Sequence, residues 1–391
     1  MLMQTLDLSN NQIGSIPKRI FNLKNLTKLD LSNNQLGSIP KELFQLKGLK
    51  YLVLRNNQIG SIPKELYQLD TLTELDLSNN QIGSIPKELS QLQTLMELDL
   101  SNNQIEAIPK ELSQLKNLMV NPALHVDVDI SELDLSHNQI GSIPRVLSQL
   151  QTLTKLDLSN NQIESIPKEL SHLKDLWTLD LSNNQIGSIP KDLSQLKDLW
   201  ELDFSHNQIG SIPKDLSQLK DLKYLGLSDN QIESIPKELS QLENLRELNI
   251  SDNKLRMIPT ELLRLVESKG LRKLELDLRG NRLKMQPDSL PKSCNLEQIH
   301  FDDKELITMS YNEVVHLKEQ GLRTWLMALA NMYDIEEEHI NKLMDKDYSA
   351  MDLVHVEMEE LMEVIGRRGP ASTLHLLFSN LKSRTDQTCA F

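Results

Sequence analysis

Aromatic residues are scarce in this chain, since Phe, Trp and Tyr together make up only 4% of its 391 residues. Cysteine is scarcer still: Cys294 and Cys389 lie far apart and fit neither a disulfide framework nor a CxxC metal pair. No run of 18 apolar residues occurs, so we expect no transmembrane helix and no insertion into a membrane. The first residues, MLMQTLDLSNN, show no signal-peptide pattern, which predicts a cytoplasmic protein.

Basic residues are fewer than acidic ones: the chain has 42 Lys and Arg residues and 56 Asp and Glu residues, which gives a net charge of −14. This balance argues against nucleic acid or an anionic membrane surface as the main partner, and it suits a protein partner with a basic or mixed basic and apolar surface. Catalytic motifs are missing as well: GxxxxGK[ST], GxGxxG, HExxH and GxSxG do not occur. We therefore expect a non-enzymatic protein without a cofactor or a metal ion.

One segment, DLSNNQIGSIPKEL (residues 76–89), recurs with small changes through most of the chain. Its second Asn returns with a constant 23-residue period, except for longer intervals from Asn103 to Asn138 and from Asn253 to Asn281. Around each Asn, the Leu-x-Leu pair predicts a short strand whose leucines point inward and whose middle residue points outward. Successive strands would stack into a parallel sheet, the Asn would satisfy backbone groups at the turn, and the IGSIPKEL half would return along the outer face.

The pattern L-x-x-L-x-L-x-x-N-x-L/I is the leucine-rich-repeat signature, and about twelve units over residues 1–290 carry it. The 23-residue unit resembles the cytosolic class found in Ras-pathway scaffolds, Scribble-type polarity proteins and plant intracellular Ras-group proteins. The resemblance implies an α/β solenoid, a horseshoe with a parallel sheet on its concave face. His137 and His206 stand where most units have the first Asn, and we interpret them as surface variations rather than a ligand pair.

Twelve extra residues, MVNPALHVDVDI (119–130), interrupt the register. We interpret them as a tolerated surface loop or a gene-model artefact, because an inserted loop costs little closure entropy. The alternative is a functional loop that projects over the edge of the sheet.

The sequence changes character after the repeats. Residues 291–311 read as a cap or linker, residues 312–384 as a small all-α bundle, and residues 385–391 as a tail. The bundle resembles a SAM domain through Trp325-Leu326, the segment 347–353, EELMEVIG (359–366) and Gly369-Pro370. It departs from that family in an overlong interval between Trp325 and Gly366 and in Tyr348, where Gly is frequent. A death-fold bundle and a plain helical cap are the alternatives.

The SAM resemblance implies association, including self-association, between an acidic surface and the basic start of the last helix. The acidic candidates are Glu357, Glu359 and Glu360, and the basic ones are Arg367 and Arg368. Ordinary solvated surface charge is the alternative interpretation.

The outward positions of the strands carry the candidate binding residues, and the same alternation predicts that Ser78 is exposed. Most are acidic, among them Asp76, Asp99, Asp157, Asp180 and Asp203, so we expect a negative concave face that suits Lys- and Arg-rich surfaces. Departures from the repeat should carry specificity: these are Tyr51, Val53 and Arg55 in one unit, and Trp177, Trp200 and Tyr224 in three consecutive units. The two tryptophans are one repeat period apart and should lie side by side as a binding hot spot. Packing of these rings over neighbouring aliphatic stems is the alternative.

These features together predict a protein–protein interaction adaptor or scaffold in intracellular signalling. Two alternatives remain: a substrate-recognition subunit of a ubiquitin-ligase-type or other enzyme complex, and an innate-immune sensor with a death-fold module.

Overall fold

The computed structural model describes residues 3–115, 131–259, 261–262, 274–283 and 299–300, and in the C-terminal part 322–323, 325–327, 329, 335–346, 348–366, 370–371, 374–375 and 378. The insertion 119–130, most of the linker, the tail, Arg367 and Arg368 lie outside the described residues. Two compact units divide the chain: Met1–Gln231 with Gln241–Glu247, and Ile232–Ser240 with Leu248–Phe391.

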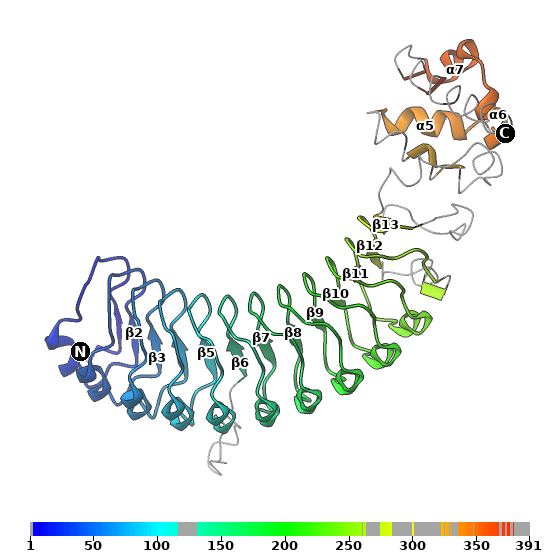
Figure 1. Ribbon diagram of the computed structural model, residues 1–391. Helices are drawn as coiled ribbons and strands as arrows, with labels where there is room; N and C mark the ends of the chain where they lie inside the picture. Colours follow the sequence, from blue (N-terminus) through cyan, green and yellow to red (C-terminus); the bar gives the residue numbers. More distant parts are fainter. Residues whose placement is uncertain are drawn as a thin grey trace. The chain divides into compact units, whose positions relative to one another are not determined.

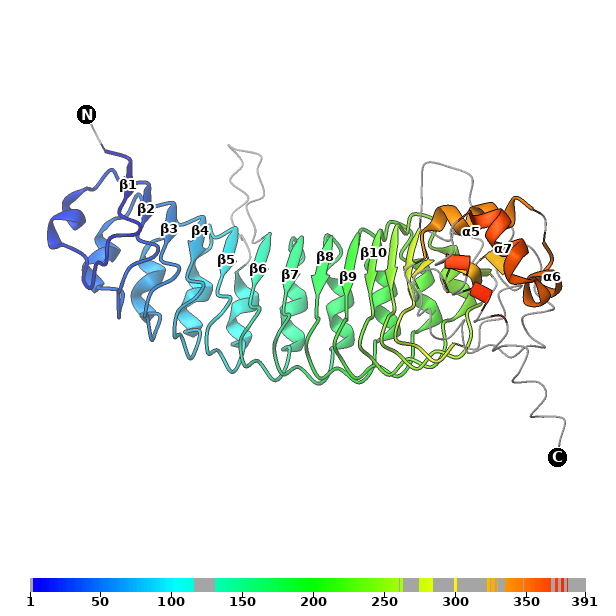
Figure 2. The same cartoon turned by 90° about the horizontal axis from the view of Figure 1, so that it is seen from above.

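Each repeat contributes one short strand, and in the first unit these strands pair in parallel in chain order (Figures 1 and 2). The strands are β1 Thr5–Asp7, β2 Lys28–Asp30, β3 Tyr51–Val53, β4 Glu74–Asp76, β5 Glu97–Asp99, β6 Glu132–Asp134, β7 Lys155–Asp157, β8 Thr178–Asp180, β9 Glu201–Asp203, β10 Tyr224–Gly226, β11 Glu247–Asn249, β12 Glu275–Asp277 and β13 Ile299–His300. In the second unit β12 pairs with β13, also in parallel.

The strand register follows the spacing of the repeats. Leu75 on β4 lies opposite Leu98 on β5, its equivalent in the next repeat. Leu98 lies opposite Leu133 on β6 although the insertion falls between them, so the sheet continues across the insertion with the same pairing. The spacing of the sequence therefore predicted the register correctly.

The return half of each repeat forms a five-residue 3₁₀ helix. These helices are η1 Lys18–Asn22, η2 Lys41–Gln45, η3 Lys64–Gln68, η4 Lys87–Gln91, η5 Lys110–Gln114, η6 Arg145–Gln149, η7 Lys168–His172, η8 Lys191–Gln195, η9 Lys214–Gln218 and η10 Lys237–Gln241. A proline precedes each one; Pro86, for example, has φ −67° and ψ 137°, an extended conformation that its ring already favours. The helix ends after five residues, where the Leu92 N–H donates to the Leu89 carbonyl.

The core lies between the strands and the 3₁₀ helices, and it consists of leucine and isoleucine rows. Leu75, Leu77 and Ile82 are fully buried, and Ile85 and Leu89 are nearly so. Packing of identical residues from one repeat to the next buries surface that a single repeat would leave exposed.

A ladder of buried asparagines joins the repeats. The Nδ2 of Asn103 donates to the carbonyls of Leu77, Leu100 and Ser101 at 3.0–3.1 Å, and its Oδ1 accepts from the Ile82 N–H at 3.0 Å. Each Asn thus bonds its own repeat to the preceding one, as the sequence predicted. The residue before it has a positive φ: 53° at Asn102, 51° at His137 and 50° at Asp229. Asn, Asp and His tolerate this left-handed conformation better than other non-glycine residues, which explains the substitutions at this position.

The described part of the second unit includes three α-helices: α5 Glu337–Met344, α6 Ala350–His355 and α7 Met358–Ile365. A capping box starts α6, since Ser349 accepts from the Asp352 N–H and the Asp352 side chain accepts from the Ser349 N–H. The segment 350–366 is not one helix, because extended Val356 and Glu357 separate α6 from α7; Gly366 ends α7 at φ 76°. Buried apolar side chains, among them Leu343, Leu353 and Leu361, form a cluster in this unit.

Candidate protein-binding face

Three parallel rows of side chains follow the strands in the first unit. The first and last residues of each three-residue strand share one face, here called the exposed face of the sheet, because side chains alternate along a strand. One row precedes the strands and includes Trp177 and Trp200. The second occupies the first strand position and includes Glu74, Glu97 and Glu132. The third occupies the last strand position and holds six successive aspartates, namely Asp76, Asp99, Asp134, Asp157, Asp180 and Asp203.

The six aspartates, here called the aspartate row, serve the fold as well as the surface. The carboxylate of Asp76 accepts from the Ser78 N–H at 3.0 Å and from the Ser78 hydroxyl at 2.6 Å. The same backbone bond recurs at Asp99, Asp134, Asp157, Asp180 and Asp203 with N···O distances of 2.7–3.0 Å. Each aspartate is half-buried. Its carboxylate therefore closes the turn after the strand and still presents charge to solvent.

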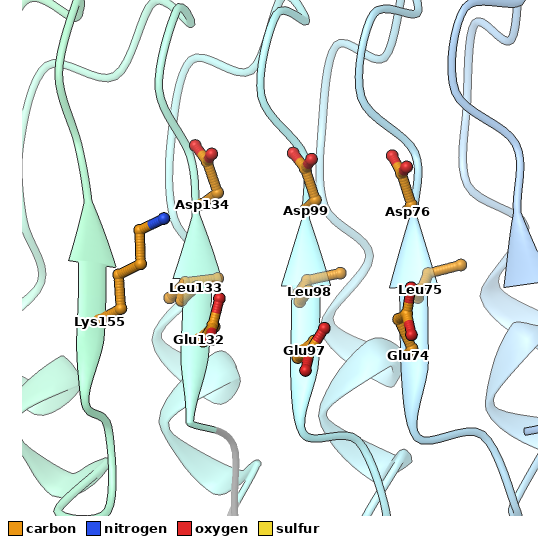
Figure 3. A pocket seen from close by; sticks show the side chains of 10 residues that line it. All are labelled: Glu74, Leu75, Asp76, Glu97, Leu98, Asp99, Glu132, Leu133, Asp134 and Lys155. Carbon is orange, nitrogen blue, oxygen red and sulfur yellow. The ribbon is translucent and has the colours of Figure 1, made fainter. Parts of the chain in front are cut away.

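The aspartate and glutamate rows line a shallow pocket over β4 to β7 (Figure 3). Its walls are Glu74, Leu75, Asp76, Glu97, Leu98, Asp99, Glu132, Leu133, Asp134 and Lys155. Figure 3 shows the carboxylates of Asp76, Asp99 and Asp134 side by side at one end of the strands, with those of Glu74, Glu97 and Glu132 at the other. Lys155 is the single cation among the lining residues.

Burial, with smaller contributions from neighbouring charges, raises the pKa of four carboxyls on this face. The pKa of the Asp180 carboxyl is raised to about 6, mainly by burial, with further contributions from the Asp157 and Asp203 charges; hydrogen bonds from Ser182 oppose the rise. Burial also raises the pKa of Asp76 and of Asp134. At the strand starts, burial and the charges of Glu74 and Glu132 raise the pKa of Glu97. A cation bound here would favour the charged form of these carboxyls, which burial and neighbouring charges disfavour.

The tryptophan pair lies where the sequence predicted. Trp177 and Trp200 stack with ring centroids 5.6 Å apart and an angle of 14° between their planes. Trp177 remains 50% exposed and Trp200 46% exposed. Tyr224 is half-buried on β10, and its hydroxyl donates to the Asp203 carboxylate at 3.2 Å.

Sequence reasoning missed two features beside the tryptophans. The Nζ of Lys223 lies 3.6 Å from the centroid of the Trp200 ring, a cation–π contact that the 23-residue spacing from Trp200 to Lys223 could have revealed. Gly226 ends the aspartate row, and a Cβ at this position would overlap the Asp203 carboxylate. The absent side chain lets Asp203 lean toward β10 and meet Tyr224.

Two expectations about exposed positions are wrong. Val53 is 9% exposed and belongs to the core edge, so it does not form an apolar surface spot. Ser78 is 4% exposed, because its hydroxyl turns back to Asp76. Tyr51 is exposed by 39% with the Lys28 Nζ 5.9 Å from its ring centroid, and Arg55 is exposed.

In the second unit, Glu357, Glu359 and Glu360 are exposed. The Glu360 carboxylate accepts from the Tyr348 hydroxyl at 2.6 Å, a bond that raises the pKa of Tyr348 to about 12. Within the described residues no group of three or more His, Cys, Asp or Glu side chains could hold a metal ion. None of the described helices is long and apolar enough to span a membrane.

Comparison with known proteins identifies the family. Models described as leucine rich repeat match residues 2–59, 24–82 and 70–120, and a leucine-rich repeat region model matches residues 131–303. These matches cover more than half of the chain, which therefore belongs to the leucine-rich-repeat family. Proteins of this family generally mediate protein–protein interactions, and the fold is typically non-enzymatic.

Among solved structures, the chain is similar to a leucine-rich-repeat protein of Leptospira interrogans, with 37% identity, coverage of 76% of this chain and 72% of that one, and a TM-score of 0.68. It is also similar to the ectodomain of the Arabidopsis thaliana membrane receptor kinase GASSHO1/SCHENGEN3, solved in complex with CASPARIAN STRIP INTEGRITY FACTOR 2. That match has 31% identity and a TM-score of 0.62, and it covers 77% of this chain but only 36% of the receptor chain. An internalin of Listeria monocytogenes, at 23% identity and a TM-score of 0.58, shares the fold. A search of curated proteins gives no match.

Proposed function

We propose that this protein is a non-enzymatic adaptor that binds a protein partner with a basic surface on the face of its repeat sheet that carries the aspartate row. The aspartate row carries the proposal: six half-buried carboxylates follow one another without an intervening cation in the row. In a parallel sheet neighbouring members of the row stand about 4.8 Å apart, so their negative charges repel one another. A Lys- or Arg-rich surface complements such a row and would gain both affinity and association rate from it.

The finer role is that of a cytoplasmic scaffold in intracellular signalling, which rests on the resemblance of the 23-residue repeat to intracellular signalling proteins. The Arabidopsis receptor ectodomain, solved with a bound factor, supports partner binding by a related repeat array. The two-part organisation, a repeat solenoid over residues 1–290 and a SAM-like module over residues 312–384, belongs to the same proposal.

Affinity capture with the full chain tests partner binding at two salt concentrations. The matched variant is Asp99→Asn with Asp134→Asn, which removes two charges and keeps an acceptor for the turn. Asn249 shows that this exchange suits the fold, since its Oδ1 accepts from the Ser251 N–H at 3.2 Å and from the Ser251 hydroxyl at 2.8 Å. We expect the variant, and high salt, to lower partner recovery several-fold. Equal recovery from a correctly folded variant would contradict the proposal.

The C-terminal segment would contribute association through Glu357, Glu359 and Glu360 on one copy and Arg367 and Arg368 on another. Sedimentation of the full chain at low salt should show a dimer or larger species that the double change Arg367→Glu and Arg368→Glu abolishes. A monomer at high concentration and low salt would exclude self-association.

A further inference from the structure

The stacked tryptophans form the most exposed aromatic surface in the described part of the chain. Trp177 and Trp200 expose about half of their surface each, and the stack lies directly before β8 and β9. Exposed apolar surface of this size is unfavourable in water, and tryptophan is enriched at the centre of protein interfaces. We therefore expect a bound ligand or partner to cover the tryptophan pair.

The chain itself shows which occupant suits an indole face in this row. Lys223 follows Trp200 by one repeat and places its Nζ 3.6 Å from the Trp200 ring centroid. Trp200 thus has an indole on one face and a cation on the other. Trp177 has one ring face against Trp200. Its other face points toward the preceding repeat, where Thr154 occupies the equivalent position. The Thr154 carbonyl accepts from the Trp177 N–H at 2.8 Å.

The charges around the open face favour a cation as well. Asp157 and Asp180 lie on β7 and β8, and Glu201 starts β9. Lys155, which starts β7, opposes a cation, and Lys223 does so from beyond Trp200. Carboxylates outnumber these two lysines on the same strands. Asp203 continues the aspartate row on β9, and no lysine or arginine interrupts that row between Asp76 and Asp203.

We propose that the open face of Trp177 binds an arginine side chain from a basic segment of the partner protein, while neighbouring cations of that segment lie over the aspartate row. Arginine fits better than lysine, because its planar guanidinium stacks on an aromatic ring and is less strongly hydrated. This inference deepens the proposed function and rests on it: the tryptophan pair would select an arginine among the basic surfaces that the aspartate row attracts.

Intrinsic fluorescence of the full chain measures the binding directly. The chain has three tryptophans, and the third, Trp325, is only 3% exposed, so a soluble quencher or ligand reports on the stacked pair. The probes are three glycine-spaced peptides of equal length that carry arginine, lysine or neutral citrulline. We expect the arginine peptide to bind several-fold more tightly than the lysine peptide and the citrulline peptide not to bind.

The variant Trp177→Leu should weaken binding of the arginine peptide about tenfold, equivalent to about 1.4 kcal/mol, with Tyr67→Leu on η3 as an exposed aromatic control that changes nothing. Because both side chains are exposed, the fold should tolerate each change, and circular dichroism checks this. Equal affinity of the three peptides, or an unchanged affinity in Trp177→Leu, would overturn the arginine site. If those results coincide with loss of partner capture in Asp99→Asn with Asp134→Asn, the adaptor function stands and the arginine site alone fails.

Discussion

At the scale of single residues, each side chain of the aspartate row has two roles, one in the turn after the strand and one on the surface. The carboxylate must accept from the serine N–H two residues later, as Asp180 does at 2.8 Å, and the same group carries the surface charge. Only the first role belongs to the fold, because Asn249 fills it without charge. The charge at the other positions is therefore available to selection for binding.

The variant Asp180→Asn should raise the free energy of unfolding by about 1 kcal/mol at pH 7, after allowance for solvent screening. The folded-state pKa of Asp180 is raised to about 6, so its carboxyl destabilises the fold when ionised, and this penalty grows as the pH rises from about 4 through 6. The gain from the variant should disappear below pH 4. Urea unfolding at several pH values measures it.

Asp7 provides a control, because its pKa is shifted in the opposite direction to that of Asp180. Its pKa is lowered, mainly by the hydrogen bond from the Ser9 N–H, so its charge favours the folded state. Asp7→Asn should therefore bring no gain at pH 7. A gain of equal size in both variants would show that charge removal alone, and not the environment of Asp180, explains the effect.

The sequence predicted the placement of some residues correctly and of others wrongly. The asparagine ladder and the tryptophan stack followed from the repeat spacing, because equivalent positions of adjacent repeats must lie side by side. Val53 and Ser78 were assigned to the surface wrongly. A two-residue alternation places both outward, but side-chain packing at Val53 and the hydrogen bond from the Ser78 hydroxyl to Asp76 bury them.

At the scale of elements, a strand, a turn and a 3₁₀ helix form one repeat whose boundaries proline and asparagine set. The strand positions were predictable from Leu-x-Leu. The short 3₁₀ helix was not predictable, since Lys-Glu-Leu sequences suit a longer α-helix equally well. Between α6 and α7, the apolar periodicity continued through a break that only the extended backbone of Val356 and Glu357 reveals.

Deletion of residues 119–130 should leave the fold intact. Without them Asn103 and the next ladder asparagine return to the common repeat period, and Ser131 takes the place that Met96 has in the preceding repeat. The Ser131 N–H already donates to the Met96 carbonyl at 2.8 Å, as equivalent residues do elsewhere. We expect a melting temperature within a few degrees of the parent, because loop length changes closure entropy only slowly. Aggregation or loss of the circular dichroism signal would contradict this.

At the scale of the whole molecule, part of the acidic excess behind the net charge of −14 lies in one place, the aspartate row of the repeat sheet. The prediction of a basic partner rests on composition, and the prediction of the face that would meet it rests on the strand pattern. Neither composition nor the strand pattern could predict which carboxyls have a raised pKa, because the pKa of a carboxyl depends on how neighbouring repeats bury it.

Binding of a basic probe should weaken as the pH falls. Asp180 loses charge as the pH falls through about 6, so a decalysine peptide should bind the full chain several-fold less tightly at pH 5 than at pH 7. Fluorescence anisotropy of the labelled peptide measures the change. In Asp180→Asn the dependence on pH should flatten over this interval, whereas an equally steep profile would assign the titration to other groups.

The asparagine ladder also has a consequence for how such a chain can change its length. Asn103 bonds to the backbone of the repeat before it through the same set of atoms as Asn80 and Asn161 do, so these junctions in the ladder are chemically the same. Gain or loss of one whole 23-residue unit would recreate an identical junction and keep every bond. Unequal recombination between repeats could therefore lengthen or shorten the binding surface in steps of one strand, and each step would add or remove one aspartate from the row.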